Sequence, residues 1–365
     1  MQSFYRGRRV LVTGNTGFKG SWLSVILALW GAKVYGYSLK ASPSEPSMYS
    51  FLDIGSYVCQ AFGDIRDRIA LASYFHIARP ELVIHMAAQP IVSEGFRDPW
   101  TTFDTNVMGT ANLLEAVRET DSVRSVVVVT SDKCYRHSGA SPVSFGEDGP
   151  LGGNDPYGAS KAAQEHVASA YAMLVSGRGV GLATVRSGNV VGGGDWARNR
   201  LVPDVMRALQ HKEDVVLRQP LSVRPWQHVL EPLLGYLRLG QMLTQQPAMY
   251  SGPWNFGPSG QRKTVQDLVE AIRGNWKHPI SVRKAESGTF HEMPSLEVDS
   301  HKAQSELGWH TVWNFETTVR TTVEWYGRWM DGGTPSQMLG MTINQITSFV
   351  QDAALERLTG MESSS

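Results

Sequence analysis

The hexapeptide Thr130–Tyr135, of sequence TSDKCY, places an acid and an amine side by side directly after an apolar run. The preceding residues Val126–Val129 predict a strand that is buried on both faces. Asp132 and Lys133 at the end of such a strand can form a solvated salt pair, the ordinary arrangement of neighbouring opposite charges. They can also exchange protons with a bound molecule. The stretch alone leaves both interpretations open.

Tyr157 and Lys161 form a second pair that could do chemistry. They lie in the segment 156–161, which opens the helix predicted over 159–174, and because they are four residues apart they share one face if this segment is helical. A fixed ammonium group stabilises a phenolate, which can then take a proton from an alcohol near neutral pH. Loss of that proton is what hydride transfer from an alcohol to a nicotinamide requires. Because this spacing is also common on helix surfaces, the pair becomes informative only beside a cofactor site.

A cofactor site is predicted by the glycine-rich turn Thr13–Gly20, which follows a strand and opens a helix. Gly14 permits a tight turn, Gly17 lets the backbone approach a pyrophosphate, and Gly20 lets the helix pack closely on the strand. The free N–H groups at the start of the helix favour an anion. The predicted cofactor-binding residues of this turn are Gly14, Thr16, Gly17, Phe18, Lys19 and Gly20.

The end of the second predicted strand bears on the choice between NAD and NADP. In dinucleotide sites an acidic residue usually lies there and binds the adenosine ribose. This chain has Ser38 and Lys40 instead, which weakens the preference for NAD and would let Lys40 tolerate a 2′-phosphate. We still predict NAD as the cofactor. Its other expected contacts are Asp64, Ile65, Ala87, Ala88, Gln89, Thr105, Tyr157 and Lys161.

Strand-like and helix-like segments alternate from residue 8 to about residue 190. The strand-like segments are nearly all apolar and span 9–12, 33–37, 82–84, 126–129 and 181–185, while 41–57 is expected to be a loop. Because parallel strands need crossover connections, the alternation predicts an α/β fold with a Rossmann-type doubly wound parallel sheet. The expected parts are a dinucleotide-binding domain over 1–190 and a smaller C-terminal nucleotide-sugar-binding lobe over 191–335, which has connections back to the sheet. The third part is a C-terminal segment over 336–365, with a helix near 343–358 and a flexible tail from 362.

The composition is typical of a soluble globular protein. Of 365 residues 42% are apolar and 19% charged, and Lys plus Arg equal Asp plus Glu at 34 each. This balance does not indicate binding to nucleic acid or to a membrane surface, and no apolar run approaches the roughly 20 residues of a membrane span. No signal peptide is expected. Cys59 and Cys134 have no metal-ligand spacing, so we expect two buried reduced thiols, no metal site and a cytoplasmic location.

Taken together, the motifs resemble the extended short-chain dehydrogenase/reductase superfamily over roughly residues 8–300. Besides the glycine turn and the Tyr–Lys pair, the resemblance includes Met86–Gln89, the segment Asn-Val-Met-Gly-Thr that begins at Asn106, and Thr130-Ser131. It implies a Rossmann domain, a C-terminal lobe for a nucleotide sugar, and a homodimer built on helices beside the active site.

Longer stretches narrow the resemblance to the CDP-glucose 4,6-dehydratases. These stretches are 14–23, 131–135, 150–157, 188–196 and 224–232, with Asn15 at a position where His is frequent. Members of that family are lyases that convert CDP-D-glucose to CDP-4-keto-6-deoxy-D-glucose, a precursor of deoxy-sugars in bacterial surface polysaccharides such as the lipopolysaccharide O-antigen. Oxidation at C4 makes the C5 hydrogen acidic, water is eliminated across C5 and C6, and the hydride returns to C6.

This chemistry suggests a role for each catalytic candidate. Tyr157 would take the 4-hydroxyl proton, Lys161 would lower the pKa of Tyr157 and hold the nicotinamide ribose, and Ser131 would hydrogen-bond the C4 oxygen. Asp132 would protonate the leaving 6-hydroxyl, and Lys133 would abstract the C5 proton, at a position where dTDP-glucose dehydratases have Glu. A lysine acts as a base only when neutral, which requires burial or neighbouring cations.

The substrate-binding residues implied by the resemblance lie mostly in the second lobe. The guanidinium group of arginine is a planar fork of donors that suits phosphate oxygens. The predicted set is Ser131, Asn189, Arg200, Arg224 and Asn255. Glu94 and His228 are not included in it, and Trp196 and Trp226 are expected to pack in the core or between the lobes.

Four other functions remain open at this point. The chain could be a dehydratase for another nucleotide sugar, or a nucleotide-sugar 4-epimerase or decarboxylase. The last two need only the Tyr–Lys pair, so Asp132 and Lys133 count against them. A non-catalytic regulatory protein that binds NAD(P) would have little reason to keep Ser131, Asp132 and Lys133 together with Tyr157.

Overall fold

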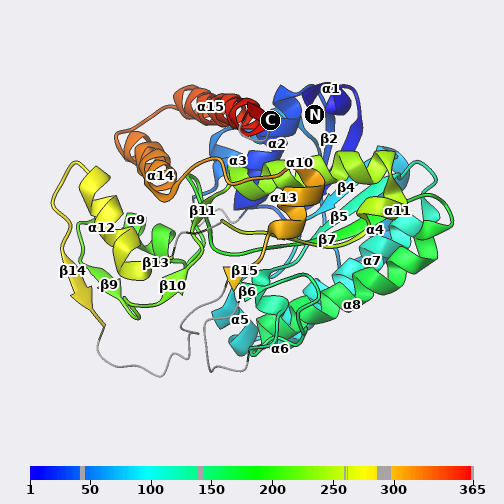
Figure 1. Cartoon of the computed structure of the whole chain (residues 1–365), viewed down its shortest axis with the longest axis horizontal. Helices are drawn as coiled ribbons and strands as arrows, with labels where there is room; N and C mark the ends of the chain where they lie inside the picture. The colour runs from blue at the N-terminus through cyan, green and yellow to red at the C-terminus, as the bar shows by residue number, and fades with distance from the viewer. Residues whose placement is uncertain (42–45, 138–143, 259, 261, 286–296, 363–365) are drawn as a thin grey trace.

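A seven-stranded parallel sheet forms the centre of the molecule (Figure 1). The computed structural model describes residues 1–41, 46–137, 144–258, 260, 262–285 and 297–362. In the sheet the strands lie in the order β12-β7-β5-β4-β1-β2-β3. They span β1 Arg9–Thr13, β2 Lys33–Ser38, β3 Cys59–Phe62, β4 Leu82–His85, β5 Ser125–Val129, β7 Gly181–Ser187 and β12 Gly252–Phe256. The direction of the strand order reverses between β1 and β4, and in doubly wound folds ligands bind outside the carboxyl ends at such a point.

The residues of the sheet alternate between two separate hydrophobic cores. In β5, Val126 and Val128 pack into the core that includes α4, α7 and α8, whereas Val127 and Val129 pack into the core that includes α2 and α10. These helices span α2 Phe18–Leu29, α4 Arg68–Ala78, α7 Gly109–Glu119, α8 Pro156–Ser176 and α10 Leu230–Gln245. Figure 1 shows the two groups of helices on opposite faces of the sheet. Cover on both faces explains why the strands are continuously apolar.

The second lobe is built from short paired strands and four helices beside the carboxyl edge of the sheet. The pairs are β6 Ser144–Phe145 with β15 Glu297–Val298, β8 Val190–Val191 with β11 Gln227–His228, β9 Val215–Leu217 with β14 Val282–Lys284, and β10 Val223–Arg224 with β13 Lys263–Thr264. The helices are α9 Leu201–His211, α12 Val265–Asn275, α13 His301–Leu307 and α14 Phe315–Met330. Between these elements β12 returns to the main sheet, so the lobe is not continuous in sequence.

The α/β class, the doubly wound parallel sheet and the five predicted strands are confirmed, with ends that differ by one or two residues. The helix predicted over 159–174 is α8, which runs from Pro156 to Ser176. The segment 41–57 is only partly a loop, since it contains α3 Met48–Phe51 and the 3₁₀ turn η1 Ile54–Tyr57. Met48, Leu52 and Ile54 are buried there, so packing against the core imposes helical turns that the Ser- and Pro-rich sequence did not suggest.

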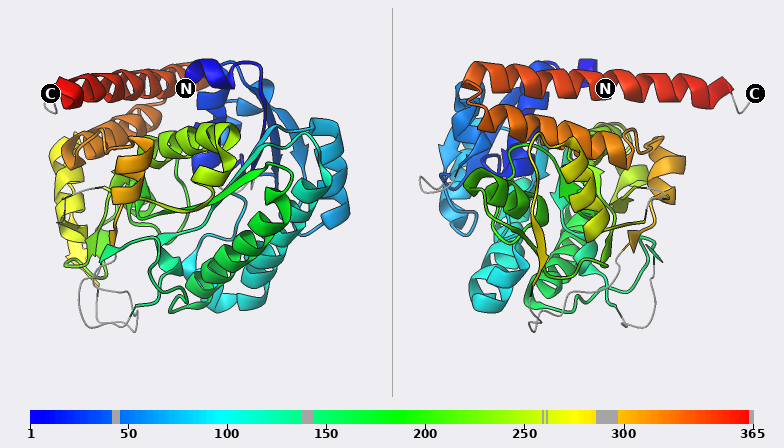
Figure 2. Two further views of the ribbon diagram at one scale, coloured as in Figure 1. Left: turned by 45° about the vertical axis from the view of Figure 1, so that its right-hand side comes forward. Right: turned by 90° about the vertical axis from the view of Figure 1, so that its left-hand side faces the viewer.

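The C-terminal helix α15, Pro335–Glu362, is longer than the predicted 343–358. It packs against α14 and α2 and runs across the top of the molecule in Figure 2, with its C-terminal end beyond the body. Its start carries a reciprocal cap, in which the side chains of Thr334 and Gln337 each accept a hydrogen bond from the other's backbone N–H. Glu362, predicted as part of the tail, still belongs to the helix, and 363–365 lie outside the described residues.

Two further observations concern burial. Cys134 is buried as expected, but Cys59 is exposed, because it lies on β3 at the edge of the sheet. Among the described residues, no helix combines the length and the apolar character that crossing a bilayer requires.

The remaining short elements are α1 Gln2–Tyr5, α5 Val92–Arg97, α6 Pro99–Phe103, the π-helical turn η2 Asp104–Met108, the 3₁₀ turn η3 Asp132–Cys134 and α11 Pro247–Tyr250.

Candidate active site

The hexapeptide at the end of β5 forms a tight turn against the start of α8. Ser131 caps the turn η3 by accepting a hydrogen bond from the Lys133 backbone N–H at 3.2 Å, and its own hydroxyl donates to Asp132 Oδ1 at 2.9 Å. The Lys133 carbonyl lies so close to Gly158 that a Cβ there would be 2.7 Å from it. The absence of a side chain at Gly158 therefore lets the turn contact the helix that carries Tyr157.

Asp132 and Lys133 do not form the salt pair that the sequence left open. No ion pair or hydrogen bond joins their side chains in the described part of the chain, and the Lys133 ammonium has no other such partner there. Asp132 is buried, with 4% of its surface exposed, and its Oδ2 faces Gly188 at the end of β7. Lys133 is half-buried. The two side chains are thus available for separate tasks.

Tyr157 and Lys161 lie on the first two turns of α8, which Asp155 caps by accepting a hydrogen bond from the Gly158 N–H at 2.9 Å. Both side chains are buried, and Lys161 Nζ is 6.0 Å from the centroid of the Tyr157 ring. Lys161 Nζ donates to the Val129 carbonyl at 3.2 Å and to Gln164 Oε1 at 2.8 Å. These bonds fix the ammonium at the end of β5, beside the turn η3.

Burial affects the two groups in opposite ways. It lowers the pKa of Lys161 to about 8, although the charge of Glu165 acts in the other direction. It raises the pKa of Tyr157 to about 12, while a hydrogen bond from Ser131 and the charge of Arg200 act to lower it. Desolvation of the phenol is thus the largest influence on the pKa of Tyr157, and the lowering of this pKa by Lys161 stays a prediction.

The glycine turn has the geometry that a dinucleotide pyrophosphate needs. Gly14 has a φ of +71°, and a Cβ at this residue would lie 2.7 Å from the Ala87 nitrogen. A Cβ at Gly20 would lie 2.2 Å from the Gly14 carbonyl oxygen. Among the described residues no side chain caps α2 at Gly17, so the N–H groups of its first turn are left uncapped. The turn therefore suits an anion that approaches the backbone closely.

A neutral hydrogen-bonded network occupies the end of β2, where an acidic residue is usual. Ser38 Oγ donates to Asn15 Oδ1 at 3.0 Å, and Asn15 Nδ2 donates to Gln60 Oε1 at 2.6 Å. Tyr49 OH donates to the same Gln60 oxygen at 2.8 Å. Ser38 was predicted here, but Asn15, Gln60 and Tyr49 were not, since only the pairing of β2 with β3 brings Gln60 to this position.

The other predicted cofactor contacts lie around the same crevice, but several of their polar groups are already paired. The Asp64 carboxylate binds Arg66 in a close ion pair at 2.6 Å, and the Gln89 amide donates to Thr102 and accepts from the Ile91 N–H. Thr16 Oγ1 donates to the Leu39 carbonyl. Ile65 is buried against Gly109, and Ala87, Ala88 and Thr105 are half-buried. For Asp64 and Gln89 the structure favours backbone contacts over side-chain contacts to a cofactor.

Lys19 turns away from the glycine turn and reaches the catalytic residues. Its Nζ donates to Ser187 Oγ at 3.0 Å and approaches the Tyr236 hydroxyl at 3.5 Å. Burial and the charge of Arg200 lower the pKa of Lys19 to about 7, whereas Asp132 raises it. Its side chain thus lies at the carboxyl end of β7 rather than along the path of the pyrophosphate.

The predicted substrate residues of the second lobe fall into two groups. Asn189, Arg200 and Arg224 lie in the lobe beside the crevice, and Arg200 pairs with Asp195 at 3.0 Å and influences the pKa of Tyr157. Asn255 differs, because its side chain is fully buried behind the site. It accepts from the Tyr135 hydroxyl at 2.9 Å and donates to the Phe145 carbonyl at 2.8 Å. The Asn255 side chain therefore serves the scaffold, with its oxygen and its nitrogen both bonded within the protein.

The residues left outside the predicted set are also placed. Glu94 on α5 pairs with Arg97, and His228 is fully buried between Trp22 and Trp313, so His228 does not line the crevice. Trp196 packs against Tyr326 and Trp329, and Trp226 is buried in the larger core, as predicted.

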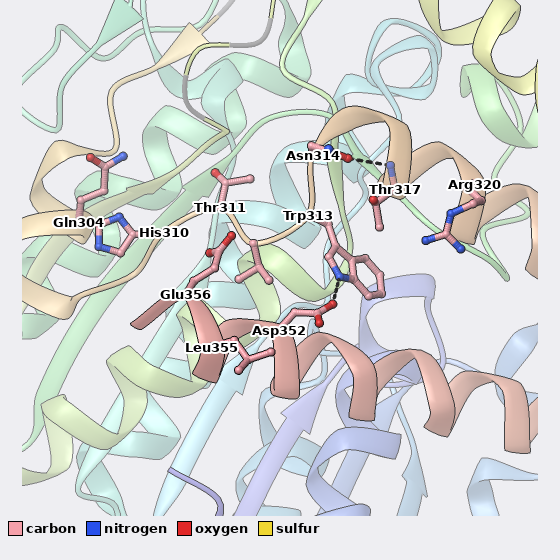
Figure 3. Close-up of a pocket in the computed structure, with 11 residues that line it drawn as sticks. Gln304, His310, Thr311, Trp313, Asn314, Thr317, Arg320, Asp352, Leu355 and Glu356 are labelled. Carbon is pink, nitrogen blue, oxygen red and sulfur yellow. Dashed lines mark hydrogen bonds between the residues drawn. The ribbon is translucent and has the colours of Figure 1, made fainter. Parts of the chain in front are cut away.

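A large open hollow lies between α15 and the segment 310–320, and it contains none of the predicted site residues (Figure 3). Asp352 of α15 points into it and accepts a hydrogen bond from Trp313 Nε1 at 2.8 Å. Asn314 lies on the other wall and caps α14 through the Thr317 N–H. The bond between Trp313 and Asp352 ties the C-terminal helix to the segment before α14, and we assign no ligand to the hollow.

Comparisons with known proteins agree with this geometry. The family model described as GDP-mannose 4,6 dehydratase matches residues 11–322. The chain is 43% identical over 338 residues to the CDP-glucose 4,6-dehydratase of Salmonella typhimurium (strain LT2), covering 91% of this chain and 94% of that protein. It is 28% identical over 343 residues to the dTDP-glucose 4,6-dehydratase of Neisseria meningitidis serogroup B, covering 87% and 93%.

A solved structure agrees in fold. The UDP-glucose-4-epimerase from Stenotrophomonas maltophila, with bound NAD and formylated UDP-arabinopyranose, superposes with a TM-score of 0.77 at 25% identity, over 89% of this chain and 99% of that one. The matches extend across both lobes, so they include the glycine turn, the turn η3 and the Tyr–Lys helix together. The chain therefore belongs to the GDP-mannose 4,6 dehydratase family of the extended short-chain dehydrogenase/reductase superfamily, in its CDP-glucose 4,6-dehydratase branch.

Proposed function

We propose that this protein is a lyase that converts CDP-D-glucose to CDP-4-keto-6-deoxy-D-glucose with NAD as cofactor. The observation that carries the proposal is the contact between the turn η3 and the start of α8, which places an acid and an amine beside a buried Tyr–Lys pair. A 4-epimerase needs only the Tyr–Lys pair, Tyr157 and Lys161. The 43% identity to a CDP-glucose 4,6-dehydratase supports the choice of nucleotide.

The chain's own residues divide the reaction between two elements. On α8, Tyr157 takes the 4-hydroxyl proton and Lys161 keeps its ammonium beside it. On the turn η3, Ser131 binds the C4 oxygen, Asp132 gives a proton to the leaving 6-hydroxyl, and Lys133 removes the C5 proton. The Lys133 ammonium has no ion-pair partner in the described ranges of the chain, and this supports the assignment, because a salt bridge to Asp132 would hold both groups in their charged forms.

NAD fits the crevice through the close backbone approach at Gly14 and Gly20 and the uncapped N–H groups of α2. When bound, NAD supplies the hydride acceptor for C4, the hydride donor for C6, and a positive ring charge. The neutral network of Ser38 and Asn15 suits a ribose hydroxyl, which both donates and accepts hydrogen bonds. Asn189, Arg200 and Arg224 are proposed to bind the nucleotide sugar.

A panel of sugar nucleotides tests the proposal. The purified protein is incubated with NAD and, separately, with CDP-, dTDP-, GDP- and UDP-glucose, and the products are identified by mass spectrometry and by the 4-keto chromophore in alkali. We expect loss of water from CDP-glucose in clear preference to the others. A preference for dTDP-glucose would contradict the choice of nucleotide, and formation of a 4-epimer without loss of water would contradict the reaction class.

We further propose a homodimer that forms through the helices beside the active site. Large apolar side chains are exposed on α5, α6, η2 and α8, which pack against one another. They are Phe96, Trp100, Phe103, Met108, Met173 and Leu174, and Trp100 is 81% exposed. Phe96, Trp100, Phe103 and Met108 lie on the short elements that pack on α8, whereas Met173 and Leu174 lie near its C-terminal end. Exposed apolar side chains that gather on neighbouring helices mark an interaction site, and a twofold pair is the commonest assembly of identical chains. The expected assembly would act in the cytoplasm, where nucleotide sugars and NAD are available and thiols such as Cys59 remain reduced.

Light scattering during size exclusion tests the dimer. The wild type should elute with twice the mass of one chain, and Trp100→Glu should shift the protein towards the monomer because it places a charge in the apolar patch. Leu221→Glu is the matched control, since Leu221 is 78% exposed but lies in the second lobe, away from these helices. A wild type with the mass of a single chain would contradict the proposal.

A further inference from the structure

A buried ion pair lies directly behind the proposed catalytic turn. Glu165 of α8 and Arg186 of β7 face each other, with side chains only 4% and 3% exposed. Arg186 Nε donates to Glu165 Oε1 at 2.9 Å and Arg186 Nη2 donates to Oε2 at 2.8 Å, so the contact is bidentate. The reaction proposed above gives neither residue a role.

Both ends of the hexapeptide Thr130–Tyr135 are bound to this pair. At its start, the Thr130 hydroxyl donates to Glu165 Oε1 at 2.5 Å. At its end, the Tyr135 hydroxyl accepts from Arg186 Nη1 at 2.7 Å, and the guanidinium carbon lies 4.8 Å from the centroid of the Tyr135 ring. Four residues lie between these anchors, and three of them are the proposed catalytic residues Ser131, Asp132 and Lys133.

The same pair is also fixed to the other half of the site. Glu165 lies four residues after Lys161 on α8, so the two side chains share a face of the helix. A displacement of α8 would therefore move the hexapeptide through Glu165, and a displacement of the hexapeptide would likewise move α8. We propose that Glu165 and Arg186 are positioning residues, which clamp the acid–base turn to the helix of Tyr157 and Lys161 so that elimination follows oxidation at one sugar.

Energetics favour this interpretation over a purely stabilising role. A buried ion pair contributes little net stability, because desolvating two charges costs about as much as their attraction returns. Its value lies in a fixed geometry, and a misplacement of about 1 Å in an active site can cost roughly 10²-fold in rate. The inference rests on the proposed function, since it assigns the clamp to the elimination step.

Two threonines provide a matched test that leaves the ion pair in place. Thr130→Val removes the hydroxyl that anchors the hexapeptide to Glu165 and that also approaches the Val185 carbonyl at 3.2 Å. Thr184→Val removes the hydroxyl that donates to Glu165 Oε2 at 2.6 Å, but Thr184 lies within β7 and not on the catalytic turn. Both threonines are buried to a similar extent, with 6% and 5% of their surface exposed.

We expect both variants to lose similar stability but only Thr130→Val to lose activity. Its kcat for CDP-glucose should fall about tenfold with KM nearly unchanged, and the absorbance of reduced nicotinamide should accumulate, because oxidation on α8 continues while elimination is slowed. Amide hydrogen exchange of residues 131–135 should rise in Thr130→Val and not in Thr184→Val, whether or not the protein turns over CDP-glucose.

Equal kcat and equal exchange in the two variants would overturn the clamp. If Thr130→Val does not fold, Tyr135→Phe makes the same test at the other end of the hexapeptide, because it removes the hydroxyl that accepts from Arg186. Failure of the wild type to dehydrate any sugar nucleotide would instead refute the proposed function, and the exchange measurement would still decide the positioning role.

Discussion

Replacement of Tyr157 by Phe should lower kcat for CDP-glucose by about 10³-fold while KM changes only a few-fold, because general acid–base catalysis by a positioned side chain contributes roughly 10²–10⁴-fold. The ring of Phe fills the same buried space beside Lys161, so binding of the sugar nucleotide should persist. Only the acceptor for the 4-hydroxyl proton is lost. Initial rates of product formation over a range of CDP-glucose concentrations measure both constants.

The matched control is Tyr171→Phe, on the same helix. The Tyr171 hydroxyl contacts only Glu115, at 3.3 Å, among the described residues, and it lies four turns along α8 from the crevice. Its removal should leave kcat within about twofold of the wild type, as for most surface substitutions. A Tyr157→Phe variant with wild-type kcat would exclude Tyr157 as the group that accepts the proton.

The pH dependence of the wild type should report Lys161. Its proposed role needs the ammonium form, and burial lowers the pKa of Lys161 to about 8, so this form is lost as the pH rises through about 8. We therefore expect kcat/KM of the wild type to decline as the pH rises through about 8, and we expect the residual kcat/KM of Lys161→Met to show no such decline. Burial raises the pKa of Tyr157 to about 12, so the phenolate that takes the 4-hydroxyl proton gains population as the pH rises.

The sequence predicted those parts of the site that depend on local spacing. Gly14, Gly17 and Gly20 lie within one turn, and Tyr157 and Lys161 within one helix, so a short window contains the whole geometry. The strands were predictable for a similar reason, because burial on both faces leaves a continuous apolar run. Which strands pair, and in which order, was not predicted, because these runs do not specify the neighbours of a strand.

The parts that the sequence did not reveal depend on contacts between distant segments. Gln60 reaches Asn15 only after β3 pairs with β2, and Arg186 meets Glu165 only after α8 packs on β7. Asn255 looked suitable for a substrate, but the direction of its side chain depends on the register of β12 against β7. The contact of Arg186 had a local signal in the sequence, because an arginine within the buried strand Gly181–Ser187 requires a partner.

Replacement of Lys133 by Met should abolish elimination while oxidation at C4 survives, with a fall in product formation of about 10²–10³-fold. The Lys133 side chain makes no ion pair or hydrogen bond among the described residues, so its loss should cost little stability. Lys33→Met is the matched control, because Lys33 is exposed at the amino end of β2, the opposite end of the strand from the crevice. It should keep wild-type activity.

Deuterium at C5 separates the base from the acid. In D₂O, wild-type product should carry deuterium at C5, because the abstracted proton is replaced from solvent. Asp132→Asn keeps the shape of the acid but cannot protonate the leaving hydroxyl, so CDP-glucose recovered from this variant should contain deuterium at C5 without loss of water. CDP-glucose recovered from Lys133→Met should contain none, because its C5 proton is never removed. Normal deuterium incorporation at C5 with Lys133→Met would exclude Lys133 as the base. Asp132 would then be the only residue of the turn with a proposed role in proton transfer.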